Sequence, residues 1–168
     1  MPDNYICKIA TPEEMNRKWD EEIERNPDDR QNWEIWKKQF SENFQKGYIL
    51  SYYGILNGAI ICEATAAVKP EAFPNSDRLI GDKTAYLYAF RTVEEYQGKG
   101  YFSKLLKFML KDLRQKGFTK ATLGVEPAEE KNKKIYKHYG FTEKIKSSTE
   151  TYPDGTVIRV DYYGKTIQ

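Results

Sequence analysis

Two glycines separated by one residue lie at the start of a strongly periodic segment, and residues of this type and spacing can bind a phosphate group. The stretch reads Gln97, Gly98, Lys99, Gly100, Tyr101 and Phe102. Glycine lets the backbone turn and approach a ligand without a Cβ in the way. The first amides of a helix lack an acceptor inside the helix, and the helix dipole adds partial positive charge there. The pattern therefore predicts an anion site suited to a pyrophosphate.

A strand and a helix must flank these glycines if they are to hold an anion. Residues 86–93 are predicted to form the strand. After the glycines, apolar residues recur at steps of three and four, which puts them on one face of a helix that ends at Gly117. These residues are Phe102, Leu105, Leu106, Met109, Leu110 and Leu113.

Two common pyrophosphate motifs do not match this stretch. The dinucleotide-binding fingerprint needs a third glycine at position 103, which is Ser103 here, and an acid about 20 residues further on. The P-loop needs Gly-Lys-Ser/Thr after four intervening residues, and the chain lacks it. An NAD- or nucleotide-binding α/β domain is therefore a disfavoured alternative.

Residues 97–102 resemble instead the acyl-CoA pyrophosphate loop of the GNAT N-acetyltransferase superfamily, whose pattern is Gln/Arg-x-x-Gly-x-Gly/Ala. The family usually has Gly or Ala where this chain has Phe102, so we expect this ring to point into the core or the cofactor to lie slightly differently. Residues 132–141 are similar to the end of the family's next helix. They contain its Tyr-x-x-x-Gly-Phe signature as Tyr136, Gly140 and Phe141.

The resemblance implies an α/β (α+β) fold with a mixed, mostly antiparallel sheet of about seven strands and helices on both faces. Residues 1–168 are expected to form a single domain of this kind. In the family, the two central strands splay apart and the cofactor's pantetheine arm passes between them. Here these strands would be 86–93 and 119–125, which leaves backbone groups of Phe90 and Thr92 free to bond the arm.

The resemblance also implies acetyl-CoA as co-substrate, and two cysteines give no indication of a metal site. The expected cofactor-binding residues are Phe90, Thr92, Gln97, Gly98, Lys99, Gly100, Tyr101, Phe102 and Asn132. Asn132 lies one turn before Tyr136 and is expected to bond the pantetheine arm. The family more often has Asn one turn earlier, where this chain has Glu129. Lys104 and Lys131, like Lys99, are long enough to reach the nucleotide phosphates.

Acyl transfer from a thioester to an amine requires a base for the amine, stabilisation of an oxyanion and an acid for the leaving thiolate. The resemblance makes Tyr136 the general acid, since a phenol with a pKa of about 10 is protonated at neutral pH. Strand 86–93 has no acid before Glu94. The base is therefore left between Glu126, our first choice, Glu63 and a water chain. Strand alternation places Glu63 toward solvent, or alternatively toward the acceptor.

Local patterns predict the remaining elements. Residues 5–9 form a strand, and Thr11 caps a helix whose buried stripe is Met15, Trp19 and Ile23. A second helix carries Trp33, Trp36, Phe40 and Phe44 on one face. Asn57-Gly58 marks a hairpin between strands 48–56 and 59–68, and 69–82 is a loop that borders the site. A helix over 128–139 precedes a hairpin of strands 141–151 and 156–164.

Composition excludes several classes of protein. The 168 residues carry 27 basic and 25 acidic side chains, a net charge of +2 that gives no global field for nucleic acid or an anionic membrane. No run of about 18 apolar residues exists, and the first residues do not resemble a signal peptide, so we expect a cytoplasmic protein. The two cysteines, Cys7 and Cys62, are expected to pack in the core.

The resemblance and the residues together predict an N-acetyltransferase that moves an acetyl group from acetyl-CoA to an amine by direct attack. The acceptor is left open between a small primary amine and an N-terminal or lysine amine of a peptide. The alternative is a non-catalytic acyl-CoA-binding sensor or regulatory module of the same fold. A homodimer formed through the C-terminal hairpin is one option, and neither nucleic acid nor a membrane is an expected partner.

Overall fold

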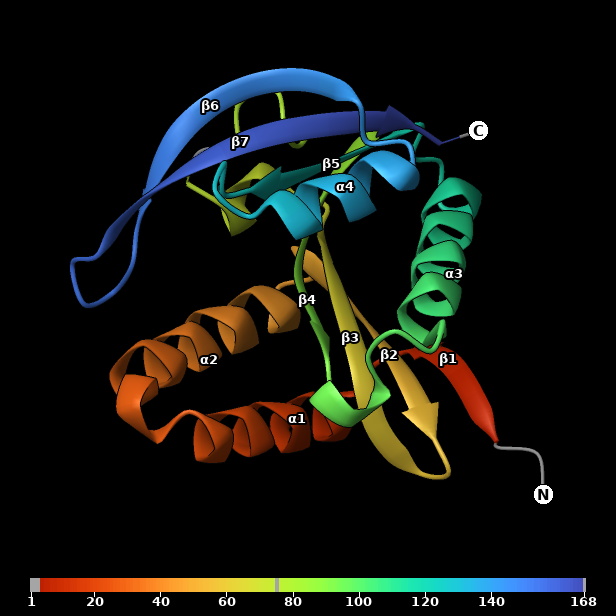
Figure 1. Ribbon diagram of the computed structural model, residues 1–168, viewed down its shortest axis with the longest axis vertical. Coiled ribbons are helices and arrows are strands. Elements are labelled where there is room, and N and C mark those ends of the chain that lie inside the picture. The colour runs from red at the N-terminus through yellow and green to blue at the C-terminus, as the bar shows by residue number, and fades with distance from the viewer. Residues whose placement is uncertain (1–3, 75, 168) are drawn as a thin grey trace.

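The chain is built from both helices and strands in this computed structural model, which describes residues 4–74 and 76–167 (Figure 1). In chain order the strands and α-helices are β1 (Tyr5–Ile9), α1 (Pro12–Arg25), α2 (Arg30–Gln45), β2 (Ile49–Leu56), β3 (Ala59–Ala67), β4 (Thr84–Thr92), α3 (Tyr101–Gln115), β5 (Lys120–Val125), α4 (Glu130–His138), β6 (Glu143–Thr151) and β7 (Val157–Thr166). Three short 3₁₀ turns are η1 (Pro27–Asp29), η2 (Pro70–Ala72) and η3 (Glu94–Tyr96).

The strands form one seven-stranded sheet in the order β1-β2-β3-β4-β5-β7-β6. Only the central pair, β4 and β5, is parallel, and the other neighbours are antiparallel. The crossover between the parallel strands contains α3, as a parallel connection requires. The predicted mixed, mostly antiparallel sheet of about seven strands is therefore confirmed.

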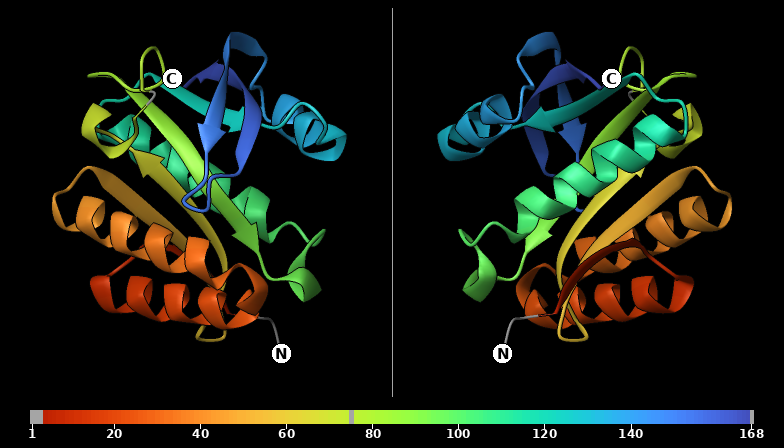
Figure 2. Two further views of the ribbon diagram at one scale, coloured as in Figure 1. Left: turned by 90° about the vertical axis from the view of Figure 1, so that its left-hand side faces the viewer. Right: turned by 90° about the vertical axis from the view of Figure 1, so that its right-hand side faces the viewer.

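Helices cover both faces of the sheet (Figure 2). On one face, α3 buries the predicted stripe of Leu105, Leu106, Met109 and Leu113 against the strands. On the other face, α1 and α2 pack with Tyr86 of β4 and Tyr162 of β7 through Met15, Trp19 and Phe40. In α1, α2 and α3, the residues that face the sheet are those of the predicted apolar stripes, because burying apolar side chains lowers the free energy.

The start of α1 matches its predicted capping box. The Thr11 Oγ1 accepts a bond from the Glu14 amide (3.2 Å), and the Glu14 carboxylate accepts one from the Thr11 amide (3.0 Å). The predicted stripe of Met15, Trp19 and Ile23 is buried. This cap fixes where α1 begins, and so sets how the helix lies over the sheet.

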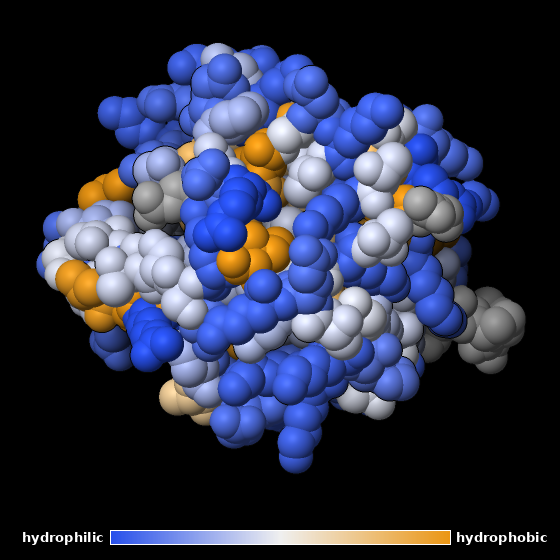
Figure 3. Space-filling view, turned by 90° about the horizontal axis from the view of Figure 1, so that it is seen from above, coloured by the Kyte–Doolittle hydropathy of each residue, from blue (hydrophilic) through white to orange (hydrophobic). Residues whose placement is uncertain are grey.

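The β6–β7 hairpin reaches across the sheet to α2 (Figure 1). At its tip, the Asp154 amide donates to Asn32 Oδ1 (2.9 Å), and Asn32 Nδ2 donates to Asp154 Oδ2 (3.0 Å). Asn32 is 2% exposed. Along β6, exposed and half-buried residues largely alternate, and the face seen from above is mainly hydrophilic with small separate hydrophobic patches (Figure 3). The hairpin therefore turns one face to solvent and the other toward the interior.

The two central strands part midway along their length. Parallel pairing of β4 with β5 runs from Thr84↔Lys120 to Leu87↔Leu123, although β4 continues to Thr92 and β5 to Val125. Beyond Leu87, the described residues of β4 pair only with β3. This finding confirms the predicted splay between the two central strands.

A bulge in β4 follows the last residue that pairs with β5. Across the β3–β4 ladder, Thr65 faces Tyr88 and Glu63 faces Arg91. One residue of β3 therefore opposes two of β4, the first of which is Ala89. Ala89 has a φ of +55°, which residues other than glycine rarely adopt. A bulge bends its strand and increases the local twist, which explains why β4 leaves β5 at this point.

Replacing Ala89 with valine should destabilise the fold by about 1–3 kcal/mol, because a β-branched residue is strained at positive φ. Ala89→Gly is the matched control, since glycine adopts this conformation without that strain. Urea unfolding of both variants measures the difference. Equal stability of the two would show that Ala89 is not held at positive φ.

Candidate active site

A cavity of about 420 Å³ lies between the separated ends of β4 and β5. Its size is typical of a pocket for a small ligand. The aromatic part of its wall comes from β4, α4 and the end of β6 and consists of Tyr86, Tyr88, Phe90, Tyr136 and Tyr152. The charged and amide side chains of the wall are Arg91, Glu126, Glu129, Asn132 and Glu150. The cavity thus combines an aromatic lining with groups able to move protons.

The structure divides the predicted site residues between two places. Phe90, Glu126, Asn132 and Tyr136 line the cavity. The others lie at the end of β4, in the loop after η3 and in the first turn of α3. Both places are at the carboxyl end of β4, where the predicted cofactor would have to lie.

The glycine loop has the geometry expected of an anion cradle. Gly98 has a φ of +74° and Gly100 a φ of +87°, conformations that glycine adopts without strain. A Cβ added at either position would meet nothing within 4 Å among the described residues. Gly100 is the residue directly before α3, whose first amides have no acceptor inside the helix. The cradle is open at the positive end of the helix.

Gln97 and Thr92 contact each other at the entrance to this loop. The Gln97 side-chain amide donates to the Thr92 carbonyl oxygen at 3.0 Å, and Thr92 lies opposite Cys62 on β3. The carbonyl of Thr92, which we expected to be free for the pantetheine arm, is therefore bonded within the chain. Gln97 holds the loop against the end of β4, and the roles of both residues toward a cofactor stay predictions.

Aromatic packing fixes the first turn of α3. The Phe102 ring packs on Phe90 (ring centroids 5.2 Å apart) and Tyr139 (6.4 Å), so it points into the interior as expected. Tyr101 packs against Tyr5 at 4.7 Å, and the Tyr5 hydroxyl donates to the Tyr101 carbonyl oxygen at 2.8 Å. The large side chain at position 102 therefore turns away from the cradle and stiffens the helix start.

Tyr136 is in the predicted helix, α4, and lines the cavity. Its ring packs on Phe90 with centroids 5.8 Å apart. Burial, and then the nearby carboxylate of Glu129, raise the pKa of Tyr136 to about 12. The phenol is thus protonated over the whole physiological range, so it can donate a proton but not accept one.

Glu126 lies where β5 gives way to α4 and lines the cavity beside Glu129. Burial, followed by Glu129, raises the pKa of the Glu126 carboxyl. The Asn132 side-chain amide donates to Glu129 at 2.9 Å. Asn132 therefore orients the Glu129 carboxylate. Its contact with a pantetheine arm stays a prediction.

The solvent-facing orientation expected for Glu63 is wrong. Glu63 is 6% exposed and pairs with Arg91, whose Nε lies 2.7 Å from its carboxylate. The Arg91 guanidinium lies 4.7 Å from the centre of the Trp33 ring and 5.4 Å from that of Trp19. Alternation failed here because α1 and α2 cover this face, so both faces of β3 are buried. Arg91, and not Glu63, lines the cavity.

Glu150 lines the cavity although the sequence analysis did not identify it. It lies on β6, and its Oε1 accepts a bond from the hydroxyl of Tyr162 on β7 at 2.9 Å. Burial raises the pKa of the Glu150 carboxyl, and the Tyr162 bond acts in the opposite direction. The one sequence signal was its position two residues before Tyr152, which places both on one face of an extended chain.

The remaining residues with chemical potential have structural roles or face solvent. Cys62 is buried and Cys7 half-buried against the α3 core, which confirms their expected packing. Burial raises the pKa of both thiols, so neither is an activated nucleophile. Lys99 and Lys104 are exposed near the cradle. Within the described residues, no group of three or more His, Cys, Asp or Glu could hold a metal ion, and no helix could span a membrane.

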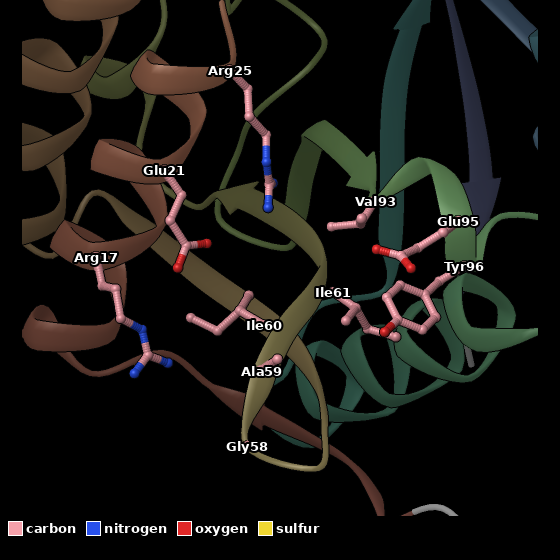
Figure 4. Close-up of a pocket in the computed structure, with 10 residues that line it drawn as sticks. All are labelled: Arg17, Glu21, Arg25, Gly58, Ala59, Ile60, Ile61, Val93, Glu95 and Tyr96. Atoms are coloured by element: carbon pink, nitrogen blue, oxygen red, sulfur yellow. The ribbon is translucent and has the colours of Figure 1, made fainter.

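A second hollow of about 360 Å³ lies between α1, the β2–β3 turn and η3 (Figure 4). Arg17, Glu21 and Arg25 of α1 line one side, and Glu95 and Tyr96 line the other. Its two guanidinium groups are matched by two carboxylates. Among the described residues it shares no lining residue with the cavity between β4 and β5, so the predicted chemistry belongs to that cavity.

Residues 11–141 match the family model described as the acetyltransferase (GNAT) family. This match spans most of the chain. The chain belongs to the GNAT acetyltransferase family. Membership indicates acetyl transfer as the class of reaction, with acetyl-CoA as the donor that the family uses. No curated protein sequence matches the chain.

Solved structures of GNAT acetyltransferases share its fold. The ribosomal-protein-S18-alanine N-acetyltransferase of Escherichia coli superposes with a TM-score of 0.71 at 16% identity, over 98% of this chain and 95% of that one. A ribosomal-protein-alanine N-acetyltransferase of Brucella melitensis gives 0.67 at 13% identity, over 96% and 99%. The protein yncA of Salmonella typhimurium, solved with its cofactor acetyl-CoA, gives 0.69 at 15% identity, over 98% and 95%.

The cradle allows a direct test of cofactor binding. Gly100→Glu should weaken CoA binding by roughly tenfold or more, which is about 1.4 kcal/mol, because it places a carboxylate where the diphosphate is expected. Isothermal titration with CoA measures this loss.

Gly117→Glu is the matched control, since Gly117 follows α3, has a φ of +96° and is equally open. It adds the same charge and backbone strain at the other end of the helix. Equal CoA affinity of the two variants would contradict the assignment of the cradle.

Proposed function

We propose that the protein is an N-acetyltransferase that transfers the acetyl group of acetyl-CoA directly to an amine acceptor. The acceptor is a small primary amine, or the N-terminal or lysine amine of a peptide. The main support is the phenol of Tyr136, which lines the cavity that opens where β4 and β5 part. A proton donor at this position is what the leaving thiolate of a thioester requires.

The residues around the cavity suit the two ends of the donor. When bound, acetyl-CoA supplies an acetyl group activated as a thioester. Gly98 and Gly100, with the first amides of α3, would bind its diphosphate. Phe90 and Asn132 line the cavity beyond the cradle and would border the pantetheine arm. The bulge at Ala89 leaves backbone groups of β4 without partners on β5, which suits an amide-rich arm.

Tyr136 acts as the general acid in this proposal. Its pKa of about 12 keeps the proton on the phenol until a strongly basic thiolate develops. The sequence-based choice of base is Glu126. Glu150 is a second candidate, since it also lines the cavity and no cation neutralises it among the described residues. Either would take the proton that the acceptor ammonium must lose before it can attack.

The alternative is a non-catalytic acyl-CoA-binding sensor. It rested on the absence of an acid in strand 86–93. Since Glu126 and Glu150 reach the cavity from other elements, the missing acid in β4 does not leave the cavity without a base. The enzyme is therefore the better supported of the two functions.

Release of free thiol from acetyl-CoA in the presence of amines tests the proposal. A suitable panel contains small diamines, a lysine peptide and a peptide beginning with alanine, because two of the similar structures are named for acetylation of a ribosomal-protein alanine. Amine-dependent release, with the acetylated product seen by mass spectrometry, is the expected result. Tight CoA binding without transfer to any amine would favour the sensor.

Tyr136→Phe should lower kcat by about 10²–10⁴-fold, the usual range for loss of a general acid, and leave CoA affinity close to that of the wild type. An assay of thiol release measures kcat, and isothermal titration measures the affinity for CoA. Tyr139→Phe is the matched control, because Tyr139 is on the same helix end but does not line the cavity. If both variants retain full turnover, Tyr136 is not the acid.

A further inference from the structure

Strand β4 does not supply a base for the acceptor amine, and the carboxylates in and near the cavity differ in what surrounds them. Glu63 is neutralised by Arg91 at 2.7 Å. Glu126 has a second carboxylate, Glu129, as its neighbour. Glu150 is held by a neutral phenol, that of Tyr162, and forms no ion pair among the described residues.

We propose that Glu150 is a catalytic residue of the acetyl transfer, which binds the acceptor ammonium and takes its proton, and that Tyr162 positions it. This inference rests on the proposed function and adds to it the identity of the base. It also restricts the acceptor to amines that bind in their protonated form, since a carboxylate without a cationic partner attracts an ammonium group more strongly than a neutral amine.

The place of Glu150 in the fold supports this role. Tyr162 is fully buried, and its ring lies in the core that α1 and α2 form on the sheet, 6.0 Å from the ring of Tyr86. Its hydroxyl therefore holds the Glu150 carboxylate from a fixed position. Ile158 and Val160 line the cavity near it, and apolar neighbours strengthen the attraction between a carboxylate and a bound cation.

The strand that carries Glu150 is fastened at its far end. Asn32 of α2 exchanges two hydrogen bonds with Asp154 at the hairpin tip. Tyr152 packs edge-on against Trp36 of α2, with ring centroids 5.2 Å apart. These contacts fix β6 over the cavity, as a catalytic carboxylate requires.

Several titratable groups interact electrostatically with Glu150. They are Tyr162 of β7, Tyr86 of β4, Tyr152 directly after β6 and Glu126 directly after β5. Of the cations, Arg91 lines the same cavity but is paired with Glu63, and Lys146 Nζ lies 5.8 Å from the centre of the Tyr162 ring. With burial as the largest cause, the pKa of Glu150 is raised, which moves the carboxylate toward the basicity of an effective proton acceptor.

Glu150 as the base and Tyr136 as the acid together account for every proton in the reaction. The acceptor ammonium gives one proton to Glu150, which passes it to solvent. The nitrogen lone pair forms the C–N bond as the C–S bond breaks, and Tyr136 gives its proton to the sulfur. The nitrogen loses its second proton, which restores the Tyr136 phenol. The products are the acetamide, free thiol and one proton in solution.

Glu150→Gln tests the inference, with the amine that the wild type uses best. It should lower kcat/KM by about 10²–10⁴-fold at neutral pH and abolish the rise of kcat/KM with pH that reports ionisation of the base. CoA affinity and the melting temperature should stay close to those of the wild type. Glu126→Gln is the comparison variant and should keep the rising limb.

Tyr162→Phe separates positioning from a structural role. The hydroxyl donates to the carboxylate and so stabilises its charged form, and its loss raises the pKa of Glu150. The rising limb of the pH profile should therefore move to higher pH in this variant. A purely structural role would lower the rate at every pH and leave the limb in place.

The outcomes distinguish this inference from the function on which it rests. If the wild type acetylates no amine, both the proposed function and the role of Glu150 are contradicted. If the wild type is active and Glu150→Gln keeps its rate and its rising limb, only the assignment of Glu150 falls. Loss of the limb in Glu126→Gln, with retention in Glu150→Gln, would return the role of base to Glu126.

Discussion

The end of backbone pairing between β4 and β5 at Leu87 and Leu123 is the constraint on which the site depends. Because the bulge at Ala89 bends β4 away, the two strands cannot close their ladder, and the gap becomes a cavity at the centre of the sheet. The same stretch of β4 leads directly into the glycine loop and α3. One irregularity in one strand therefore opens a cavity lined by a tyrosine of α4 and a carboxylate of β6, and the same strand leads to the glycine loop beyond it.

Much of this architecture follows from short-range signals. The capping box at Thr11, the turn at Asn57 and the stripe of α3 depend on neighbours within one or two turns of chain, so their residue types predict them. Recognition of the cradle and of Tyr136 came from family resemblance together with the glycines. Glu150 was missed because its relevance depends on the pairing of β6 with β7 and on the bond from Tyr162, which no local spacing encodes.

The carboxylates of the molecule show how surroundings decide the role of one chemical group. Glu63 on β3 and Glu22 on α1 are both buried in ion pairs, with Arg91 and Lys18 respectively. Such pairs cost desolvation energy, and they persist when the geometry and further bonds compensate it. The alternation of residues along β3 predicted that Glu63 faces solvent. This prediction was wrong because α1 and α2 cover that face of the sheet, which local sequence does not encode. The cavity carboxylates differ because they keep a free side facing the open space.

The contact between Tyr5 and the start of α3 joins two segments that are far apart in the sequence. The Tyr5 ring occupies the space that a side chain at Gly54 would fill, and its hydroxyl holds the Tyr101 carbonyl at the helix start. The edge strand β1 thus holds the first turn of α3, although the two residues are 96 positions apart in the chain. Removal of the amino-terminal residues through Tyr5, by proteolysis or by deletion, would remove this hydrogen bond. We expect the affinity for acetyl-CoA to fall as a result, while the rest of the sheet stays paired.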